Sequence, residues 1–318
     1  FERYHQLVPS DDKALLHLAE SALNGESFPE AVKYYQEYLA KYPNNLQAKK
    51  NLAAAFFFVK KPVDSYNVFK TIPVDSLDAK SLVRYGQAAN AVHDTTATID
   101  AWSRAVKLDT TLSPIEYFLS NTLFAAKRYD EAIVHFRKHL AMTPDDAGAE
   151  LNMGLCYIVL KDFPNSILAF KRVTELKPEY YLGYRWLALA YVYADSADQA
   201  TDTYQAMIKL ALADTLSDHS QELNEAYRSI AAYQLASGGK LQKAEKIDEA
   251  KKHYNEALSS LQTALKYDSK NARTHALLAD AYALLGKTED ACKEIKTTLK
   301  LDPKNAEMLK LQKDLSCE

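Results

Sequence analysis

The sequence repeats itself at intervals of about 34 residues. In the clearest unit, residues 147–180, Gly154 and Tyr157 lie in one apolar segment, Phe170 lies in a second, and Pro178 follows that second segment. Apolar residues spaced three and four apart predict an amphipathic helix, and a proline favours its end. Each unit is therefore predicted to be two antiparallel helices, and a period of this length predicts a row of such units rather than one globular core.

The composition favours an all-helical chain. Only 8 Gly and 10 Pro occur in 318 residues, which is few for a sandwich or a barrel, and a hydrophobic share of 47% excludes a disordered chain. We therefore predict an all-α solenoid of about eight helix-turn-helix repeats that forms a single domain over residues 1–318. The predicted repeats are 12–45, 46–78, 79–112, 113–146, 147–180, 181–214, 224–271 with insertions, and 272–305, followed by a C-terminal capping helix at 306–318.

The repeated positions identify a family. Small residues such as Gly86, Gly154 and Ala188 fall where two helices must approach closely, and aromatic residues such as Tyr191 and Phe170 fall beside them. This pattern resembles the tetratricopeptide repeat (TPR) family, which also places a proline after the second helix. The resemblance implies a right-handed α-solenoid, and a non-enzymatic scaffold or adaptor that binds a protein partner.

The unit at 224–271 is longer than the others. It has 48 residues, 14 more than the usual 34. Seven of them are assigned to a turn around Gly238 and Gly239, and seven to a longer second helix. A heptad stripe marks that helix, formed by Ala250, Tyr254, Ala257, Leu261 and Ala264.

The long second helix is predicted to project from the solenoid and to need a cover for its apolar face. The preceding polar linker, residues 215–223, is the predicted cover because it carries Leu216 and Leu223. The alternatives are the next unit, another chain, or a partner that docks on the projecting ridge.

The sequence carries no motif for catalysis or for a cofactor. No GxGxxG or GxxxxGK[ST] segment occurs, so no phosphate-binding loop is predicted. His135 and His139 have the spacing of a two-histidine metal pair, but no third ligand is nearby in the sequence. Cys156 lies on an apolar helix without an obvious base. We therefore predict no enzyme activity, no cofactor and no metal.

The overall charge argues against nucleic acid as a partner, and the lengths of the apolar runs argue against a membrane span. The chain has 39 Lys and Arg against 42 Asp and Glu, a net charge of -3, which gives no positive field to attract nucleic acid. No apolar run approaches the ~20 residues that span a bilayer, so no membrane span is predicted.

A partner-binding groove follows from the resemblance, because the first helices of TPR proteins line a concave surface. Most residues at the corresponding positions are apolar, and Arg84, Arg185, Arg228 and Arg273 are predicted to form a rim. Such a strip predicts the docking of an amphipathic helix or an extended peptide, and the alternative is packing between adjacent first helices. The predicted groove residues are Phe57, Phe58, Tyr117, Asn121, Phe124, Leu151, Leu155, Ile158, Arg185, Leu189 and Tyr193.

Other functions are weighed against this one. TPR proteins that bind the C-terminal carboxylates of chaperones use a Lys and an Asn in one early first helix. The matching positions here are Leu16 and Glu20, or Lys50 and Ala54, which argues against a chaperone adaptor. The remaining alternatives are a structural subunit that self-associates and a glycan-binding module built on the aromatic residues that crowd 180–193.

The cysteines bear on the compartment. Cys292 starts a second helix and Cys317 ends the capping helix, and antiparallel packing would bring them together, so a bridged and a free pair both stay open. A bridge would favour an exported protein. The chain begins at Phe1 rather than Met, which we interpret as a lean toward the bacterial periplasm or cell surface after removal of a signal peptide, with the cytoplasm as the alternative.

Overall fold

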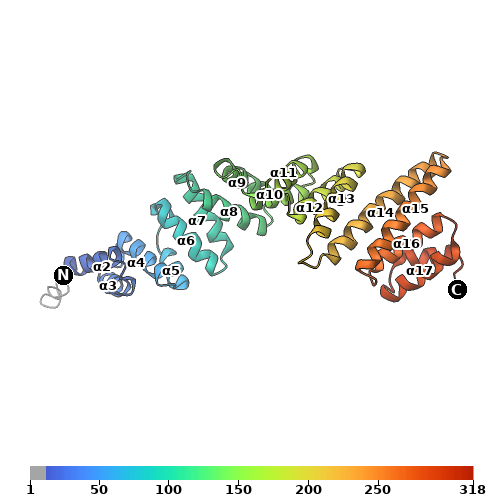
Figure 1. Ribbon diagram of the computed structural model, residues 1–318. Coiled ribbons are helices and arrows are strands. Elements are labelled where there is room, and N and C mark those ends of the chain that lie inside the picture. The colour runs from blue at the N-terminus through green and yellow to red at the C-terminus, as the bar shows by residue number, and fades with distance from the viewer. Residues whose placement is uncertain (1–11, 318) are drawn as a thin grey trace. The chain divides into compact units, whose positions relative to one another are not determined.

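The computed structural model describes residues 12–317. Within that range it contains seventeen α-helices, one short 3-10 helix and no strand, so the all-α prediction is confirmed. Most successive α-helices pack against each other across short turns (Figure 1). The elements are α2 (Asp12–Asn24), α3 (Phe28–Lys41), α4 (Leu46–Phe58), α5 (Pro62–Phe69), η1 (Val74–Ser76), α6 (Ala79–Ala91), α7 (Thr95–Leu108), α8 (Ser113–Ala125), α9 (Tyr129–Met142), α10 (Ala147–Val159), α11 (Phe163–Leu176), α12 (Tyr181–Tyr193), α13 (Ala197–Ala213), α14 (Ser220–Lys243), α15 (Ile247–Tyr267), α16 (Ala272–Leu284), α17 (Thr288–Leu301) and α18 (Ala306–Asp314).

The described residues divide into two compact units, 12–156 and 157–317, and the boundary between them falls within α10. Each unit holds a series of small cores between neighbouring helices rather than one centre. In the N-terminal unit, Tyr35 and Phe69 are among the largest fully buried side chains, and in the C-terminal unit Leu261 is. The expectation of one domain over the whole chain stays a prediction. No helix within residues 12–317 is both long and apolar enough to cross a membrane.

The turn inside each helix pair uses one backbone conformation. One residue per turn has a φ between 54° and 73°, in the left-handed region, which lets the chain reverse within three residues. In seven of the eight turns this residue is not glycine, although glycine adopts that conformation at least cost. The residues are Glu26, Lys60, His93, Lys127, Lys161, Asp195, Glu245 and Gly286.

The predicted turn around Gly238 and Gly239 is wrong. Both glycines lie inside α14, and the turn to α15 is centred on Glu245. Gly238 instead permits close packing, because a Cβ there would lie 2.4 Å from a ring carbon of Tyr254 on α15. A Cβ on Gly86 would meet the ring of Trp102 at 2.3 Å in the same way. Gly238 therefore marks a close contact between two helices and not a turn.

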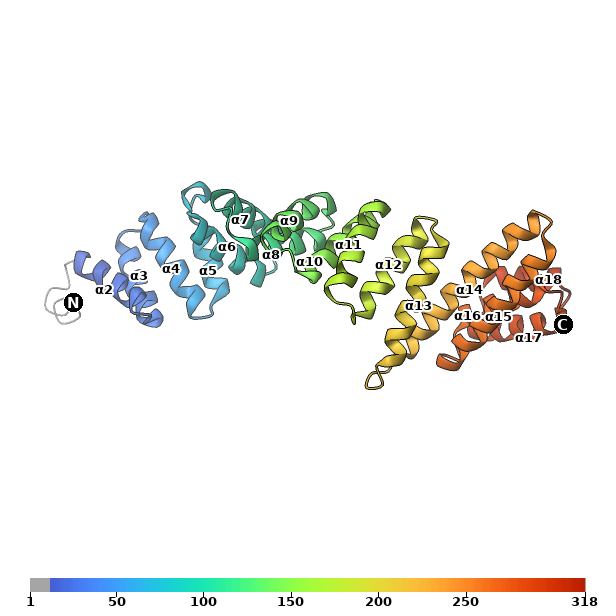
Figure 2. The same ribbon diagram turned by 45° about the horizontal axis from the view of Figure 1, so that its top comes forward.

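The insertion in this unit lengthens both helices. The two helices α14 and α15 have 24 and 21 residues, against 13 and 14 in the next pair, α16 and α17. They lie side by side along their length (Figures 1 and 2). The heptad stripe is buried as predicted: Ala250, Tyr254, Ala257, Leu261 and Ala264 are each at most 1% exposed.

The predicted cover of the long helix is also wrong. Leu216 of the linker is 97% exposed, and Leu223 belongs to the first turn of α14, where it packs in another core with Met207. The apolar face of α15 is covered by Leu235 and Leu241 of α14 and by residues of α16 such as Leu278. The stripe on α15 needs no external partner, because α14, the first helix of the same pair, is long enough to cover it.

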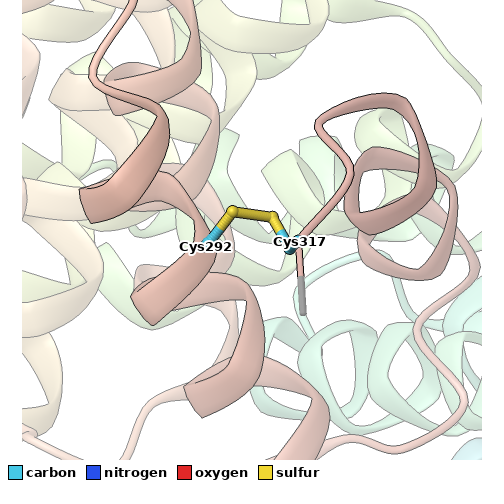
Figure 3. Close-up of a disulfide and its surroundings, with 2 residues drawn as sticks. All are labelled: Cys292 and Cys317. Atoms are coloured by element: carbon cyan, nitrogen blue, oxygen red, sulfur yellow. A yellow bond between two sulfur atoms is a disulfide. The ribbon is translucent and has the colours of Figure 1, made fainter.

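The C-terminal end is closed by α18 and a disulfide. Met308 of α18 is 1% exposed and packs against Ala279 and Ile295. Cys292 and Cys317 are bonded, with their Cα atoms 5.5 Å apart, which joins α17 to the segment after α18 (Figure 3). The pairing that the sequence left open is therefore formed in the structure.

Candidate functional site

The eleven predicted groove residues all lie on the first helices of the predicted repeats, α4, α8, α10 and α12. None of the eleven is buried, and Phe58 and Tyr193 are exposed at 41% and 51%. The aromatic residues of the repeat core behave differently, since Phe136 and Phe170 are fully buried. Seven of the eleven belong to the N-terminal unit and four to the C-terminal unit.

In the N-terminal unit a pocket opens between the first helices α2, α4 and α6. Its volume is about 450 Å³, and it includes the predicted groove residue Phe58. The ring of Phe58 stacks on Phe28 with centroids 4.5 Å apart and meets Phe57 edge-on at 5.9 Å. The pocket is lined by Leu23, Asn24, Glu26, Phe28, Gln47, Lys50, Asn51, Ala54, Phe58, Asp78, Lys80, Ser81 and Arg84.

Three cations face this pocket. Lys50, Lys80 and Arg84 stand against two carboxylates, Glu26 and Asp78. The Asp78 carboxylate is already used as a helix cap, since it accepts from the Ser81 amide at 2.8 Å. The pocket therefore has an excess of positive charge and one engaged anion.

The Arg84 guanidinium lies partly buried over the ring of Phe58, 5.2 Å from its centroid. Burial lowers the pKa of Arg84, and the nearby Asp78 offsets part of that effect. Within residues 12–317, no carboxylate lies close enough to Arg84 to form an ion pair with it. Arg84 is thus a partly desolvated cation without an ion-pair partner in that range, and an anionic ligand would be favoured beside it.

A second part of the predicted groove lies on α8 and α10. Asn152 donates a hydrogen bond of 2.8 Å to Asn121 Oδ1, and Asn121 in turn donates to the Tyr117 carbonyl oxygen at 3.0 Å. Phe124 packs edge-on against Tyr129 at 5.6 Å. The remaining predicted residues here, Leu151 and Leu155, are half-buried on α10.

In the C-terminal unit, the predicted groove cation is already paired. Arg185 binds both oxygens of Glu225, with Nε 3.0 Å from each oxygen and Nη2 2.9 Å from Oε2. This pairing raises the pKa of Arg185. Tyr193 stacks on Phe163 at 5.5 Å, while Leu189 and Ile158 are half-buried. This unit therefore offers Leu, Ile and Tyr surface, but Arg185 is not available as a free charge.

The aromatic cluster weighed for glycans is engaged within the protein. Trp186 stacks on Phe170 with centroids 6.2 Å apart, and Arg185 lies over its ring. Tyr181 packs against His219 and donates a hydrogen bond to Glu222 at 3.3 Å. Trp186 and Tyr181 therefore have neighbours within the protein, and the glycan-binding alternative stays a prediction.

The two histidines weighed as a metal pair have separate partners. His139 is buried; Ser113 Oγ lies 2.9 Å from its Nδ1, and its Nε2 lies 2.9 Å from Asp146. His135 pairs instead with the buried carboxylate of Glu116. No group of three possible metal ligands exists among the described residues.

The Ser113, His139 and Asp146 arrangement has the order of a hydrolase triad but a structural setting. Burial alone would raise the pKa of Asp146, and the hydrogen bonds from His139 and from the amides of Ala149 and Gly148 lower it below its ordinary value. The Asp146 carboxylate thus caps α10 and ties α9 to it. At the start of α8, Pro114 has no N–H, and the amides of Ser113, Ile115 and Glu116 are already bonded to backbone oxygens, so no free donor is left there for an oxyanion.

Sequence reasoning missed part of the cationic pocket. It compared Lys50 with Ala54 inside one helix and named Arg84 only as a rim residue. Lys80 and Asn51 were not singled out, although the structure places them beside Arg84 in the same pocket. The signal was present in the repeat register, because the positions that meet in space belong to successive first helices and not to one helix.

Three comparisons with known proteins agree on the family. Tetratricopeptide repeat models match residues 13–45, 119–181 and 249–315. The chain belongs to the tetratricopeptide repeat family. Among curated proteins, it is 27% identical to the Hsp70-Hsp90 organizing protein of Triticum aestivum over 219 residues, which are 65% of this chain and 37% of that protein. It is 26% identical to the tetratricopeptide repeat-containing protein trd-1 of Caenorhabditis elegans over 36% of this chain and 15% of that one. The matched part of the TPR chain thus spans 37% of the length of the first relative and 15% of the length of the second.

Solved TPR structures share the fold. The C-terminal part of a TPR repeat-containing protein from Cytophaga hutchinsonii matches 93% of this chain and 98% of its own, with a TM-score of 0.50 and 18% identity. YrrB, described as a TPR protein with an unusual peptide-binding site, matches 68% of this chain and 99% of its own, with a TM-score of 0.51 and 17% identity.

Proposed function

We propose that this TPR protein is an adaptor that binds an extended peptide segment of a protein partner in the pocket between α2, α4 and α6. The proposal rests on Arg84, which has no ion-pair partner among the described residues and shares its pocket with Lys50, Lys80 and the Phe58 ring. The relatives named Hsp70-Hsp90 organizing protein and the peptide-binding site of YrrB support the functional class. No catalytic step is part of the proposal.

The pocket suits a peptide with a carboxylate next to an apolar side chain. The carboxylate would lie against Arg84 and the two lysines, where hydrogen bonds to charged groups contribute about 1.5–3 kcal/mol each. The apolar side chain would cover the exposed part of Phe58. Backbone groups of an extended peptide would meet Asn51 and Gln47, which are already hydrogen-bonded to each other at 3.0 Å.

Further apolar side chains of the partner would lie on α8 and α10, against Tyr117, Phe124, Leu151 and Leu155. Asn121 would serve as a hydrogen-bonding group for the peptide backbone on the same surface. These residues are half-buried, so each would contribute the burial of its remaining exposed area rather than of a whole side chain.

The test selects peptides on the intact protein and then removes the charge. A display library with free carboxyl ends, and purified Hsp70 and Hsp90, are the probes, and fluorescence anisotropy measures the affinity of selected peptides. Arg84→Met is expected to weaken binding roughly 10-fold to 100-fold. Arg128→Met is the matched control, because Arg128 forms an exposed pair with Glu131 away from the pocket. Equal affinities for the two variants would contradict the proposed site, and binding to Hsp70 or Hsp90 would name the partner class.

A further inference from the structure

Arg228, in the C-terminal unit, is held rigidly without an anionic partner. Its Nη1 donates to Asn224 Oδ1 at 3.2 Å and to Asn271 Oδ1 at 3.3 Å. Asn224 is 2% exposed, and its own Nδ2 donates to the Ala264 carbonyl oxygen at 2.9 Å. The network joins α14, α15 and the start of α16, so the guanidinium is held in one place.

The Nε and Nη2 edge of Arg228 has no acceptor among residues 12–317. This edge is the one that binds a carboxylate side-on with two parallel hydrogen bonds. Burial lowers the pKa of Arg228; the Glu225 carboxylate works against that shift, and the Arg273 charge adds to it. The side chain is thus partly buried and cationic, without an ion-pair partner in the described part of the chain, and its Nε and Nη2 edge is open to a ligand.

A neighbouring pair shows what this edge does when an anion is present. Arg185 uses the same atoms, Nε and Nη2, to bind Glu225. Glu225 lies three residues before Arg228 on α14, where it could reach the same guanidinium, but it is committed to Arg185. The C-terminal unit therefore contains one satisfied arginine and one with an empty binding edge.

We infer that Arg228, with Arg273 beside it, is a binding point for one carboxylate of an acidic segment in a protein partner. This site goes beyond the proposed pocket at Arg84 and does not depend on it. A single carboxylate suits the site better than a doubly charged phosphate, because the carboxylates of Glu225 and Asp268 already lie close enough to act on Arg228.

The test uses the full chain and a probe with one carboxylate. The peptide acetyl-Ala-Glu-Ala-amide is titrated while the Nε–H signals of the arginines are followed by NMR, with acetyl-Ala-Gln-Ala-amide as the neutral control. We expect a saturable shift of the Arg228 signal with the Glu peptide alone, and no shift of Arg185. Arg84 is read in the same spectrum, so failure at either site is seen independently of the other.

Two variants sharpen the result. Arg228→Met should abolish the saturable binding and lower the melting temperature slightly, because the Oδ1 atom of the buried Asn224 loses its donor. Arg185→Met should weaken binding at Arg228 roughly 10-fold, because the freed Glu225 can then occupy the empty edge.

Three outcomes would overturn the inference. Equal, linear shifts of all arginines would mean that the peptide only changes the ionic environment. Tighter binding of inorganic phosphate than of the Glu peptide at equal ionic strength would assign the site to a phosphate group. An Arg228 signal that the Glu peptide does not move in the unaltered protein would make the guanidinium only a structural bridge between Asn224 and Asn271.

Discussion

The two compact units are both built from paired helices, but the helix pairs differ in length. In the N-terminal unit, ordinary pairs such as α8 and α9 have 13 and 14 residues. The C-terminal unit contains the long pair α14 and α15, with 24 and 21 residues, and ends in a disulfide-closed cap. The long pair keeps its stripe buried because both of its helices are extended. This TPR unit therefore accommodates its insertion because both of its helices are longer. Shortening only one of the two helices should destabilise it.

The largest expected effect comes from shortening one helix of the long pair. Deletion of Ser259–Leu265 removes seven residues from α15, including the fully buried Leu261, and leaves part of α14 without its partner. We expect a loss of about 4 kcal/mol or more in the free energy of unfolding, measured by urea denaturation.

The matched deletion shortens both helices by the same amount. Removing residues 237–243 together with 247–253 keeps the helical faces in phase around the turn. We expect a loss of only about 1–2 kcal/mol. Equal losses for the single-helix and two-helix deletions would show that the helices do not depend on each other.

The next expected effect is a loss of stability at the C-terminal end when its disulfide is reduced. Reduction of the bond between Cys292 and Cys317, which are 25 residues apart, should lower the stability of the C-terminal unit by about 2–4 kcal/mol. Hydrogen exchange measured with and without reductant should show faster exchange in α17 and α18 and unchanged exchange in the N-terminal unit. Faster exchange throughout the N-terminal unit would contradict this local effect.

Two adjacent glycines in α14 should respond in opposite directions. Gly238→Ala should cost about 1–3 kcal/mol, because its Cβ would enter the Tyr254 ring. Gly239→Ala meets no atom within 4 Å and should stabilise the helix by about 0.5–1 kcal/mol. Thermal melts of the two variants check the signs, and a stabilising Gly238→Ala would mean that the helices are farther apart than described.

The smallest effect concerns pH at the cap. Burial, and to a lesser extent Glu307 of α18, raises the pKa of Asp280 to about 6 from an ordinary 3.8. For an acid with a raised folded-state pKa, the penalty is absent below the unfolded value and complete above the folded one. Asp280→Asn should therefore stabilise the C-terminal unit by about 1–2 kcal/mol at pH 7.5 and leave it unchanged at pH 3.5. An equal gain in urea melts at both pH values would rule out titration of Asp280 as the cause.

The fold was predictable because every repeat carries the same pattern of buried residues, so the pattern occurs many times in the sequence. The site was not, because it depends on contacts between side chains of different repeats. Buried aromatic residues such as Phe136 and Phe170 followed directly from their positions in the period. The turn at Glu245 could not be predicted from composition, because the left-handed position holds a charged residue and the glycines serve helix packing.

The sequence also could not show which arginines form ion pairs. Arg84, Arg185 and Arg228 look alike in the sequence, and only the structure shows that Arg185 is paired with Glu225. Ion pairing depends on which side chains of neighbouring first helices meet, and that is fixed by the packing of one repeat on the next.

The central claim is that a partner peptide binds across α4 and α6 through the charge of Arg84. Hydrogen exchange of the full chain, with and without a saturating amount of a selected peptide, tests it most directly. We expect slower exchange in residues 46–58 and 79–91 with peptide, and loss of that protection in Arg84→Met. Protection confined to other helices, or protection that persists in Arg84→Met, would contradict it.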